Sequence, residues 1–582
     1  MAAPPTSVTT ALPARRRVRG AFPLATLVTW ALCALFLGPF LVYPVAKVMW
    51  SALTITGHFD PSLLLLPARN EDVRAAVRNS ALIGLGTVLF ATLISLPLAY
   101  ANARLRFPGK GFLTGLLLVP LILPPLVGAV GLRQILYREG PVNIALRSLH
   151  LIGPTDSINF LSADSAWTPA IIALVAALHL YPLIYLNLSA AWSNIDPSLE
   201  EAAENQGASG WGLFKTVTLP LLLPGYLSGA LIVFIFGFTD LGTPLVFNYT
   251  EVAAVKIFNG RQDLYDPSPY VLAFYLVILS GLVFWVSRRF LDGGRIATLA
   301  RGTVVSRERD AKGATFLWLY PLFLFVIGLA LLPHIGVILA SFARDWTSTF
   351  LPEWSTDRYK EIFTDPTGLA ASSVRISLIC ASLSMLIDII AGFALAYALV
   401  RGKIWGKAFL DTLAMLPLAL PGLILAFGLL TGYTGTRLDA TVYPLPLLII
   451  AYSVRRLPYA LRSVSAGLQQ MSVTLEEASL NMGASPLQTV WQVTRPLVMV
   501  NVIAAGLLTF AFAVLEVSDS LILASQKDYA PIAQAIYQLT QRTSGGPYVA
   551  CALGVLAMGL LTVTFMVANK VLGKGLGALF RA

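Results

Sequence analysis

The chain contains the stretch Leu199-Glu200-Glu201-Ala202-Ala203-Glu204-Asn205-Gln206-Gly207-Ala208-Ser209. A similar stretch follows 276 residues later, Leu475-Glu476-Glu477-Ala478-Ser479-Leu480-Asn481-Met482-Gly483-Ala484-Ser485. Asp196 and Ser472 precede the two copies, and both residue types cap the start of a helix. Gly207 and Gly483 stand where a helix stops in a left-handed residue. We therefore predict two short helices, each ended by a glycine corner and followed by a second helix capped by Ser209 or Ser485.

Further matches extend the repeat towards the N-terminus. At an offset of 297 residues the chain pairs Val77-Arg78 with Val374-Arg375, Leu98-Ala99-Tyr100 with Leu395-Ala396-Tyr397, Gly109-Lys110 with Gly406-Lys407, and Pro120 with Pro417. Two copies of one half, in register over this distance, indicate an internal duplication. The two offsets differ by 21 residues, so the first copy contains an insertion, which we place at 138–167.

Composition places both copies in a membrane. The chain of 582 residues is 56% hydrophobic and 12% charged, with a mean hydropathy of +0.73, whereas soluble domains average about 25% charged residues. The apolar residues form runs whose length is close to the roughly 20 residues that a helix needs to cross a bilayer. The net charge of +11 comes from basic residues between these runs, so it indicates orientation in a lipid membrane and no nucleic-acid partner.

The apolar runs predict an all-α polytopic membrane protein with about twelve spans, six in each copy. The predicted spans are 23–50, 76–103, 111–134, 168–192, 217–247, 270–290, 315–342, 372–400, 408–434, 441–464, 493–524 and 548–570. They imply an N-terminal tail (1–22), a first half (23–290), a linker (291–314), a second half (315–570) and a C-terminal tail (571–582). An even number of spans in each half makes the repeats parallel, with a path between them. The basic clusters predict that both termini, the linker and both Glu-Glu-Ala loops are cytoplasmic.

The duplicated loop resembles the EAA loop of permeases in binding-protein-dependent ABC importers. The resemblance rests on Glu201-Ala202-Ala203 with Gly207 and Leu219-Pro220, and on Glu477-Ala478-Ser479 with Gly483 and Arg495-Pro496. The second copy departs from the pattern at Ser479 and Arg495. The resemblance implies the type I permease fold, in a fused two-half permease of the bacterial inner membrane.

In that family each loop forms a coupling helix that seats in an ATPase subunit. The resemblance implies this role for Glu200, Glu201, Ala202, Ala203, Gly207, Glu476, Glu477, Ala478, Ser479 and Gly483. It also implies two copies of the ATPase and a periplasmic or lipid-anchored substrate-binding protein. No phosphate-binding loop of the GxxxxGK[ST] type occurs in the chain. We therefore expect no catalytic residues and no bound cofactor here, and ATP with Mg²⁺ on the partner subunits.

Acidic residues inside predicted spans are candidates for the translocation path, because charge is costly in a bilayer. Asp240 and Glu516 are equivalent at the offset of 276 and lie late in the fifth span of their halves. With Thr243 and Asp519 they form the most polar predicted intramembrane region. Two interpretations stay open: these residues line the path or its outer gate, or they are solvated at the outer interface. Asp388, without an acidic counterpart, is assigned to helix packing or a polar network.

Other chemistry receives little support from the sequence. Three cysteines and four histidines are scattered without metal-ligand spacing: Cys33, Cys380, Cys551, His58, His150, His179 and His334. We therefore predict no metal site. The main alternative class is a secondary transporter, which also uses two parallel six-span halves, and a membrane enzyme is a weaker alternative.

The cargo is predicted from resemblance alone. Phe107-Pro108-Gly109 and the segment from Glu516 to Leu521 are similar to the ferric-iron group of fused permeases. The neighbouring thiamine, polyamine and aminoethylphosphonate importers are the alternatives. We also expect the insertion at 138–167 to contact the binding protein, because only one half carries it and a binding protein docks asymmetrically.

Overall fold

The structure is a computed structural model. It describes Leu27 and residues 29–55, 58–122, 125–161, 167–263, 265–291, 308–402, 404–543 and 545–572. The predicted tail at 1–22, most of the predicted linker (292–307) and residues 573–582 of the predicted C-terminal tail lie outside the described residues. The predicted domain boundaries stay predictions.

The described chain is almost wholly helical. The first half contains η1 (Cys33–Val42), α2 (Tyr43–Ser51), η2 (Pro61–Leu65), α3 (Leu66–Arg69), α4 (Glu71–Arg104), α5 (Lys110–Leu116), η3 (Val119–Ile122), α6 (Pro125–Leu136), α7 (Pro141–Ser148), α8 (Thr168–Ser193), α9 (Pro197–Asn205), α10 (Gly210–Leu213), η4 (Phe214–Thr218), α11 (Leu219–Phe238), α12 (Gly242–Val246), α13 (Ala253–Gly260) and α14 (Ser268–Leu291).

The second half repeats this order. It contains α15 (Thr315–Ser341), α16 (Asp357–Thr364), α17 (Leu369–Arg401), α18 (Lys407–Ala419), α19 (Gly422–Tyr433), α20 (Leu445–Gln470), α21 (Val473–Asn481), α22 (Pro486–Thr489), η5 (Val490–Thr494), α23 (Arg495–Leu497), α24 (Met499–Val514), α25 (Ser518–Leu523), η6 (Lys527–Tyr529), α26 (Ile532–Thr540) and α27 (Gly546–Leu572). The short strands β1 (Thr54–Ile55) and β2 (His58–Phe59) pair antiparallel, and β3 (Leu105–Arg106) and β4 (Arg309–Asp310) pair parallel.

Several of the twelve predicted spans are not single straight helices. Within the described residues, eight helices are long and apolar enough to cross a membrane, and three further spans are helix pairs bent by more than 40°. The bent pairs correspond to the predicted third, ninth and eleventh spans. The predicted tenth span corresponds to α20. This helix carries Arg455, Arg456 and Arg462 and is too polar to be counted among the apolar spans.

The bend in the ninth span has a local cause. α18 and α19 meet at 100°, and Leu420 between them adopts an extended conformation, with φ −92° and ψ 133°. Leu420 precedes Pro421, whose ring disfavours helical geometry in the residue before it. The helix therefore ends at Ala419 and restarts at Gly422 in a new direction.

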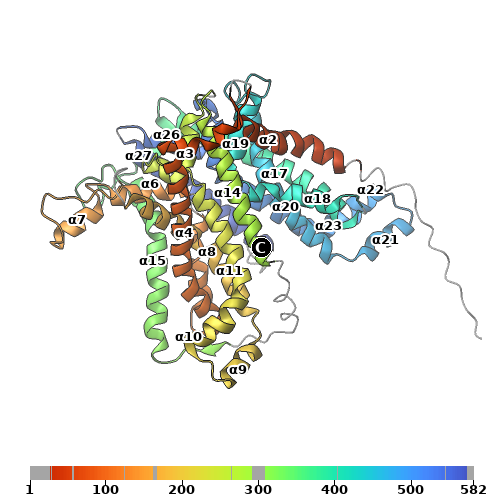
Figure 1. The fold of residues 1–582 in the computed structure, drawn as a ribbon, viewed down its shortest axis with the longest axis horizontal. Helices are drawn as coiled ribbons and strands as arrows, with labels where there is room; N and C mark the ends of the chain where they lie inside the picture. Colours follow the sequence, from red (N-terminus) through yellow and green to blue (C-terminus); the bar gives the residue numbers. More distant parts are fainter. Residues whose placement is uncertain are drawn as a thin grey trace, which may run out of the picture.

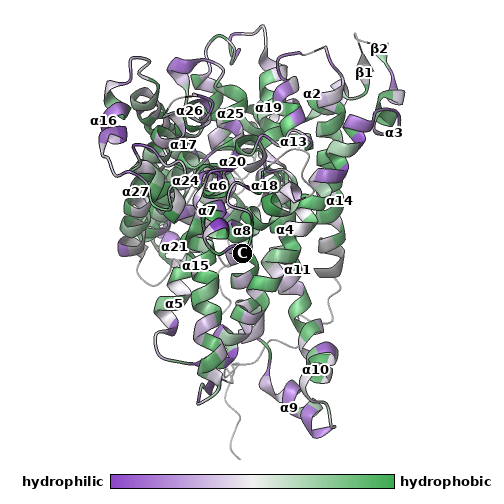
Figure 2. Ribbon diagram, turned by 90° about the vertical axis from the view of Figure 1, so that its left-hand side faces the viewer, coloured by the Kyte–Doolittle hydropathy of each residue, from purple (hydrophilic) through white to green (hydrophobic). Residues whose placement is uncertain are grey.

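Each half has a three-helix core. α4, α8 and α11 pack together in the first half, and α17, α20 and α24 form the equivalent group in the second (Figure 1). Figure 2 shows predominantly apolar ribbon along α4, α8 and α15 and polar ribbon at α9 and α16. In both views α9 and α21 lie well apart, at the ends of their respective halves.

The first helix of each half packs on the other half. α2 lies against α19, and α15 lies against α6. Two equivalent glycines, Gly131 and Gly428, permit these contacts. A Cβ on Gly131 would meet the backbone N of Val337 at 2.5 Å, and one on Gly428 would meet the backbone O of Pro44 at 2.5 Å. The exchange of first helices therefore joins the two halves at two close helix crossings.

The change Gly131→Ala tests this contact. We expect it to lower the unfolding midpoint of the purified chain, because overpacking against backbone costs about 1–3 kcal/mol. Gly328→Ala on α15 is the control, since its Cβ would have no neighbour within 4 Å. That control should be neutral or stabilising, because alanine favours helix by about 1 kcal/mol over glycine. Equal unfolding midpoints for the two variants in detergent would contradict a close crossing at Gly131.

Candidate functional site: the duplicated loops and the fifth-span breaks

The two predicted loop helices are present as α9 and α21. The Oδ1 atom of Asp196 accepts a hydrogen bond from the Ser198 N–H at 2.9 Å, and the Ser472 hydroxyl accepts one from the Thr474 N–H at 3.3 Å. The Ser198 bond lowers the pKa of Asp196, so this cap is ionised at neutral pH. Gly207 and Gly483 have φ of +89° and +90°. The predicted caps and glycine corners are confirmed.

The predicted start of the second loop helix is confirmed in both halves, but the serine side chain caps it in one half only. Ser485 forms a capping box with Gln488 before α22. Ser209 makes no side-chain cap bond before α10, so its predicted cap is wrong. Gly212 stands at the position equivalent to Gln488 and has no side chain to complete the box.

The first glutamate of each Glu-Glu-Ala motif is bound inside the protein. Glu200 pairs with Arg104 at 2.5 Å and accepts a hydrogen bond from Thr218 at 3.0 Å. The second half repeats the arrangement with equivalent residues: Glu476 pairs with Arg401 at 2.8 Å and accepts a bond from Thr494 at 2.6 Å. Each loop helix is therefore tied to the C-terminal end of the second span and to the start of the fifth.

This burial corrects one expectation. The resemblance assigned both acidic residues of each pair to the surface that seats in the ATPase, but Glu200 and Glu476 are 8% and 5% exposed. Glu201, Ala202, Gly207, Glu477, Ala478 and Gly483 are exposed, and Ala203 and Ser479 are half-buried. Helix geometry places adjacent residues on different faces, so one glutamate points inward and the next outward.

The second loop also presents apolar side chains that sequence reasoning did not single out. Leu475, Leu480 and Met482 are 47%, 44% and 89% exposed on or next to α21. At the positions of Leu480 and Met482 the first loop has Glu204 and Gln206. The two loops therefore offer different surfaces at the same place in the fold.

The fifth span of each half breaks at its acidic residue, where the sequence predicted a continuous helix. α11 ends at Phe238 and α12 begins at Gly242, and α24 ends at Val514 and α25 begins at Ser518. The Asp240 carboxylate accepts from the Gly242 N–H at 3.0 Å, and Glu516 accepts from the Asp519 N–H at 3.3 Å. Each acid stands one residue before the N-cap position and accepts from one backbone N–H in the first turn of the short helix that follows.

The break in the second half contains an ion network. Glu516 pairs with Arg455 at 2.8 Å and with Arg456, both from α20. Arg456 also donates to the Phe512 carbonyl at 2.9 Å, and Asp519 lies 3.6 Å from Arg455. Glu516 and Asp519 are 5% and 0% exposed. These two acids are thus buried in protein and not solvated at the outer interface.

The first half lacks this network. At the positions of Arg455, Arg456 and Asp519 it has His179, Leu180 and Thr243. Asp240 is half-buried and Thr243 is fully buried. The pseudo-symmetric halves therefore differ in charge at the fifth-span break. The arginines were missed because sequence reasoning sought acids within spans, although Arg455-Arg456 inside a predicted span was a visible signal.

Two further polar groups lie inside the bundle. Asp388 is fully buried on α17, which packs along α20, and its carboxylate oxygens form no hydrogen bond within the described residues, so the helix-packing alternative holds and the polar network is not seen. His179 and His334 line one small cavity of about 20 Å³, room for a single water molecule. The sequence reading treated these histidines as scattered because they come from different halves, and the packing of α15 on the first half brings them together.

The change Glu516→Gln tests whether the network holds α20 to the fifth span. We expect a loss of about 3–5 kcal/mol of stability, because it leaves two buried arginines without their carboxylate. Asp411→Asn is the control, since Asp411 pairs with Arg462 of the same helix at an exposed site and such pairs contribute about 0–1 kcal/mol. Thermal unfolding of the purified chain measures both. Equal shifts for the two variants would contradict a stabilising network.

Comparison with known proteins identifies the family. The family model described as "Binding-protein-dependent transport system inner membrane component" matches residues 77–297 and 388–574. The ferric transport system permease protein FbpB of Actinobacillus pleuropneumoniae is 26% identical over 92% of this chain and 76% of its own length. A putative ferric transport system permease protein of Haemophilus influenzae is 26% identical over 83% and 76%. The molybdenum transport system permease protein ModB of Escherichia coli is 33% identical over 29% of this chain and 71% of its own length. The chain therefore belongs to the binding-protein-dependent transport system inner membrane component family, and it carries the family domain twice.

Proposed function

We propose that this ABC importer permease moves ferric iron and couples closure of two ATPase subunits to alternating access of its two halves. Membership of the permease family sets aside the alternatives of a secondary transporter and a membrane enzyme. The cargo is supported by the ferric transport relatives that align with most of the chain. The observation that carries the coupling is the pair of identical anchors, Arg104 with Glu200 and Arg401 with Glu476.

The anchors supply a mechanical connection. A displacement of α9 acts on α4 through Arg104 and on α11 through Thr218, since Glu200 is bonded to both. The same connections lead from α21 to α17 and to η5, which continues into α23 and, after a bend, α24. The exposed side, including Ala202 and Gly207 or Ala478 and Gly483, is left for the ATPase. This chain binds no cofactor in the proposed mechanism, and ATP with Mg²⁺ acts on the partner subunits.

The arrangement of the loops supports an inward-facing state. α9 and α21 lie apart in Figures 1 and 2, whereas the first helices hold the halves together through α6 and α19. Approach of the two ATPases would bring the loops together and close the cytoplasmic side. In this orientation both termini are cytoplasmic and the substrate-binding protein delivers cargo from the opposite side.

The proposed path runs beside the fifth-span breaks. Asp240, Thr243, Glu516 and Asp519 stand at equivalent positions in the two halves, where irregular backbone interrupts the spans. Irregular backbone at membrane depth is tolerated where protein or a water-filled path surrounds it. The first half would line such a path with the single acid Asp240, and the second half with Glu516, Asp519 and their two arginines.

Reconstitution tests the proposed function. Proteoliposomes that contain the chain, its ATPase and the iron-loaded binding protein should accumulate ferric iron and show stimulated ATP hydrolysis. If thiamine, a polyamine or aminoethylphosphonate with its binding protein stimulates ATP hydrolysis and iron does not, the proposed cargo is wrong and the proposed mechanism is retained. If no ATPase subunit copurifies with the chain, the result contradicts the mechanism itself.

The glycine corners give a prediction for coupling. Gly207→Val and Gly483→Val should abolish transport, because a β-branched residue at positive φ costs about 1–3 kcal/mol and moves the loop. Gly212→Ala is the control, since its Cβ would meet nothing within 4 Å and its φ is not positive. Transport and ATPase stimulation are the measurements, with copurification of the ATPase as a readout of docking. Normal stimulation in both valine variants would contradict the role of the corners.

The insertion gives a second prediction. α7 lies within 138–167 and projects from the body of the molecule in Figure 1, and Glu139 accepts a backbone bond from Ser348 of the second half. We propose that this segment contacts the binding protein. Deletion of part of 140–164 should reduce ATPase stimulation by the loaded binding protein and leave the basal rate unchanged. Full stimulation after the deletion would contradict this contact.

A further inference from the structure

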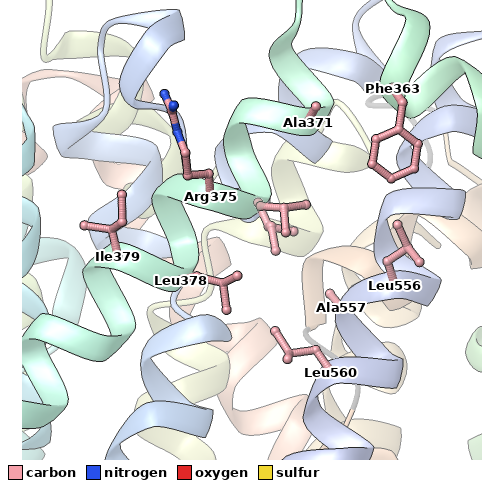
Figure 3. A pocket seen from close by; sticks show the side chains of 10 residues that line it. Phe363, Ala371, Arg375, Leu378, Ile379, Leu556, Ala557 and Leu560 are labelled. Atoms are coloured by element: carbon pink, nitrogen blue, oxygen red, sulfur yellow. The ribbon is translucent and has the colours of Figure 1, made fainter.

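We propose that the outer side of the second half holds a specific anionic phospholipid, with its phosphate on Arg375 and an acyl chain in the groove between α17 and α27. The groove has a volume of about 500 Å³, within the range typical of small-molecule sites. All of its lining residues except Arg375 are apolar (Figure 3).

The groove exists because two long helices are held apart. α26 packs against both α17 and α27, and α16 bridges the same two helices further out. The small side chains of Ala371 and Ala557 line the gap. Phe363 of α16, which is 74% exposed, stands at its edge. An open apolar groove on membrane-spanning helices faces hydrocarbon, so an acyl chain is its natural occupant.

Arg375 lies at the depth of lipid headgroups. Arg401, at the other end of α17, is bound to the cytoplasmic loop, and the 26 residues between the two arginines span about 39 Å of helix. A bilayer with its headgroups is about 40–45 Å thick. Arg375 therefore reaches the headgroup layer opposite the loop. Figure 3 shows its guanidinium extending away from the apolar side chains.

The charge of Arg375 is available to a ligand. Its side chain is exposed, and within the described part of the chain it forms no ion pair or hydrogen bond. Arg78 is the equivalent arginine of the first half, where Glu251 pairs with Lys256 at 3.2 Å. Glu251 precedes the start of α13 by two residues, and the equivalent residue before α26 is Ala530. The second half thus keeps the arginine without the acid.

Basic residues beside transmembrane grooves recognise anionic lipid headgroups. Because the arginine forms no internal ion pair and the groove adjoins it, the site binds both parts of one phospholipid. The guanidinium of Arg375 selects for an anionic headgroup, and the apolar groove retains the acyl chain.

Lipid exchange tests the proposal on the full purified chain. The chain in mild detergent is incubated with equal amounts of phosphatidylglycerol and phosphatidylethanolamine, and the retained lipids are quantified by mass spectrometry. Arg375→Gln should lower the ratio of retained phosphatidylglycerol to phosphatidylethanolamine about fivefold, the factor that corresponds to about 1 kcal/mol per basic residue. Arg78→Gln, the equivalent change in the first half, should leave the ratio unchanged.

A second variant tests the groove separately. Ala371→Trp fills the apolar gap and keeps Arg375, so it should reduce the retention of both lipids. Gel filtration and the unfolding midpoint show whether each variant is folded. If the Ala371→Trp variant is not folded, the lipid ratio of Arg375→Gln alone tests the proposal. An unchanged lipid ratio in Arg375→Gln would overturn the proposal. A loss of equal size in Arg78→Gln would overturn it too, because the effect would then be one of general surface charge.

Discussion

A buried ion pair at the cytoplasmic end of each half, Arg104 with Glu200 and Arg401 with Glu476, is the interaction on which the arrangement depends. Charges with so little exposure are tolerated only when they are paired and hydrogen-bonded. The pair and its threonine bring three elements to one point: the end of the second span, the loop helix and the start of the fifth span. Because the point exists in both halves, the two loops are bonded to equivalent helices. The duplication therefore preserves a connection and not merely a motif.

The same requirement explains the largest difference between the halves. Arg455 and Arg456 enter the bundle on α20 and are neutralised by Glu516, with Asp519 close by. The first half has no arginine here, with His179 and Leu180 at the equivalent positions. Its fifth-span break has the simpler hydrogen bond from the Gly242 N–H to Asp240. The two breaks thus share a backbone geometry while their electrostatics diverge.

Local features of this fold could be predicted from the sequence, and long-range ones could not. Capping chemistry and glycine corners depend on a few adjacent residues, so Asp196, Ser472, Gly207 and Gly483 were read correctly. The burial of Glu200 and the exposure of Glu201 depend on which face of the helix meets Arg104. This face is known only from the packing of the helices. The bend before Pro421 was available as a signal, because the residue before proline resists helix. The exchange of first helices, and with it the meeting of His179 and His334, leaves no local trace except the small residues at Gly131 and Gly428.

The central claim is that the buried pair transmits motion and does not merely stabilise the loop. The most direct measurement is a double-mutant cycle of Arg401→Gln and Glu476→Gln, with thermal stability and ATPase stimulation by the loaded binding protein read on each variant. Each single change leaves an unpaired buried charge, so both should be unstable and uncoupled. The double variant should regain most of the stability, because no unpaired charge remains, and should still fail to stimulate hydrolysis. Recovery of stimulation together with stability would contradict the account, since the pair would then serve the fold alone.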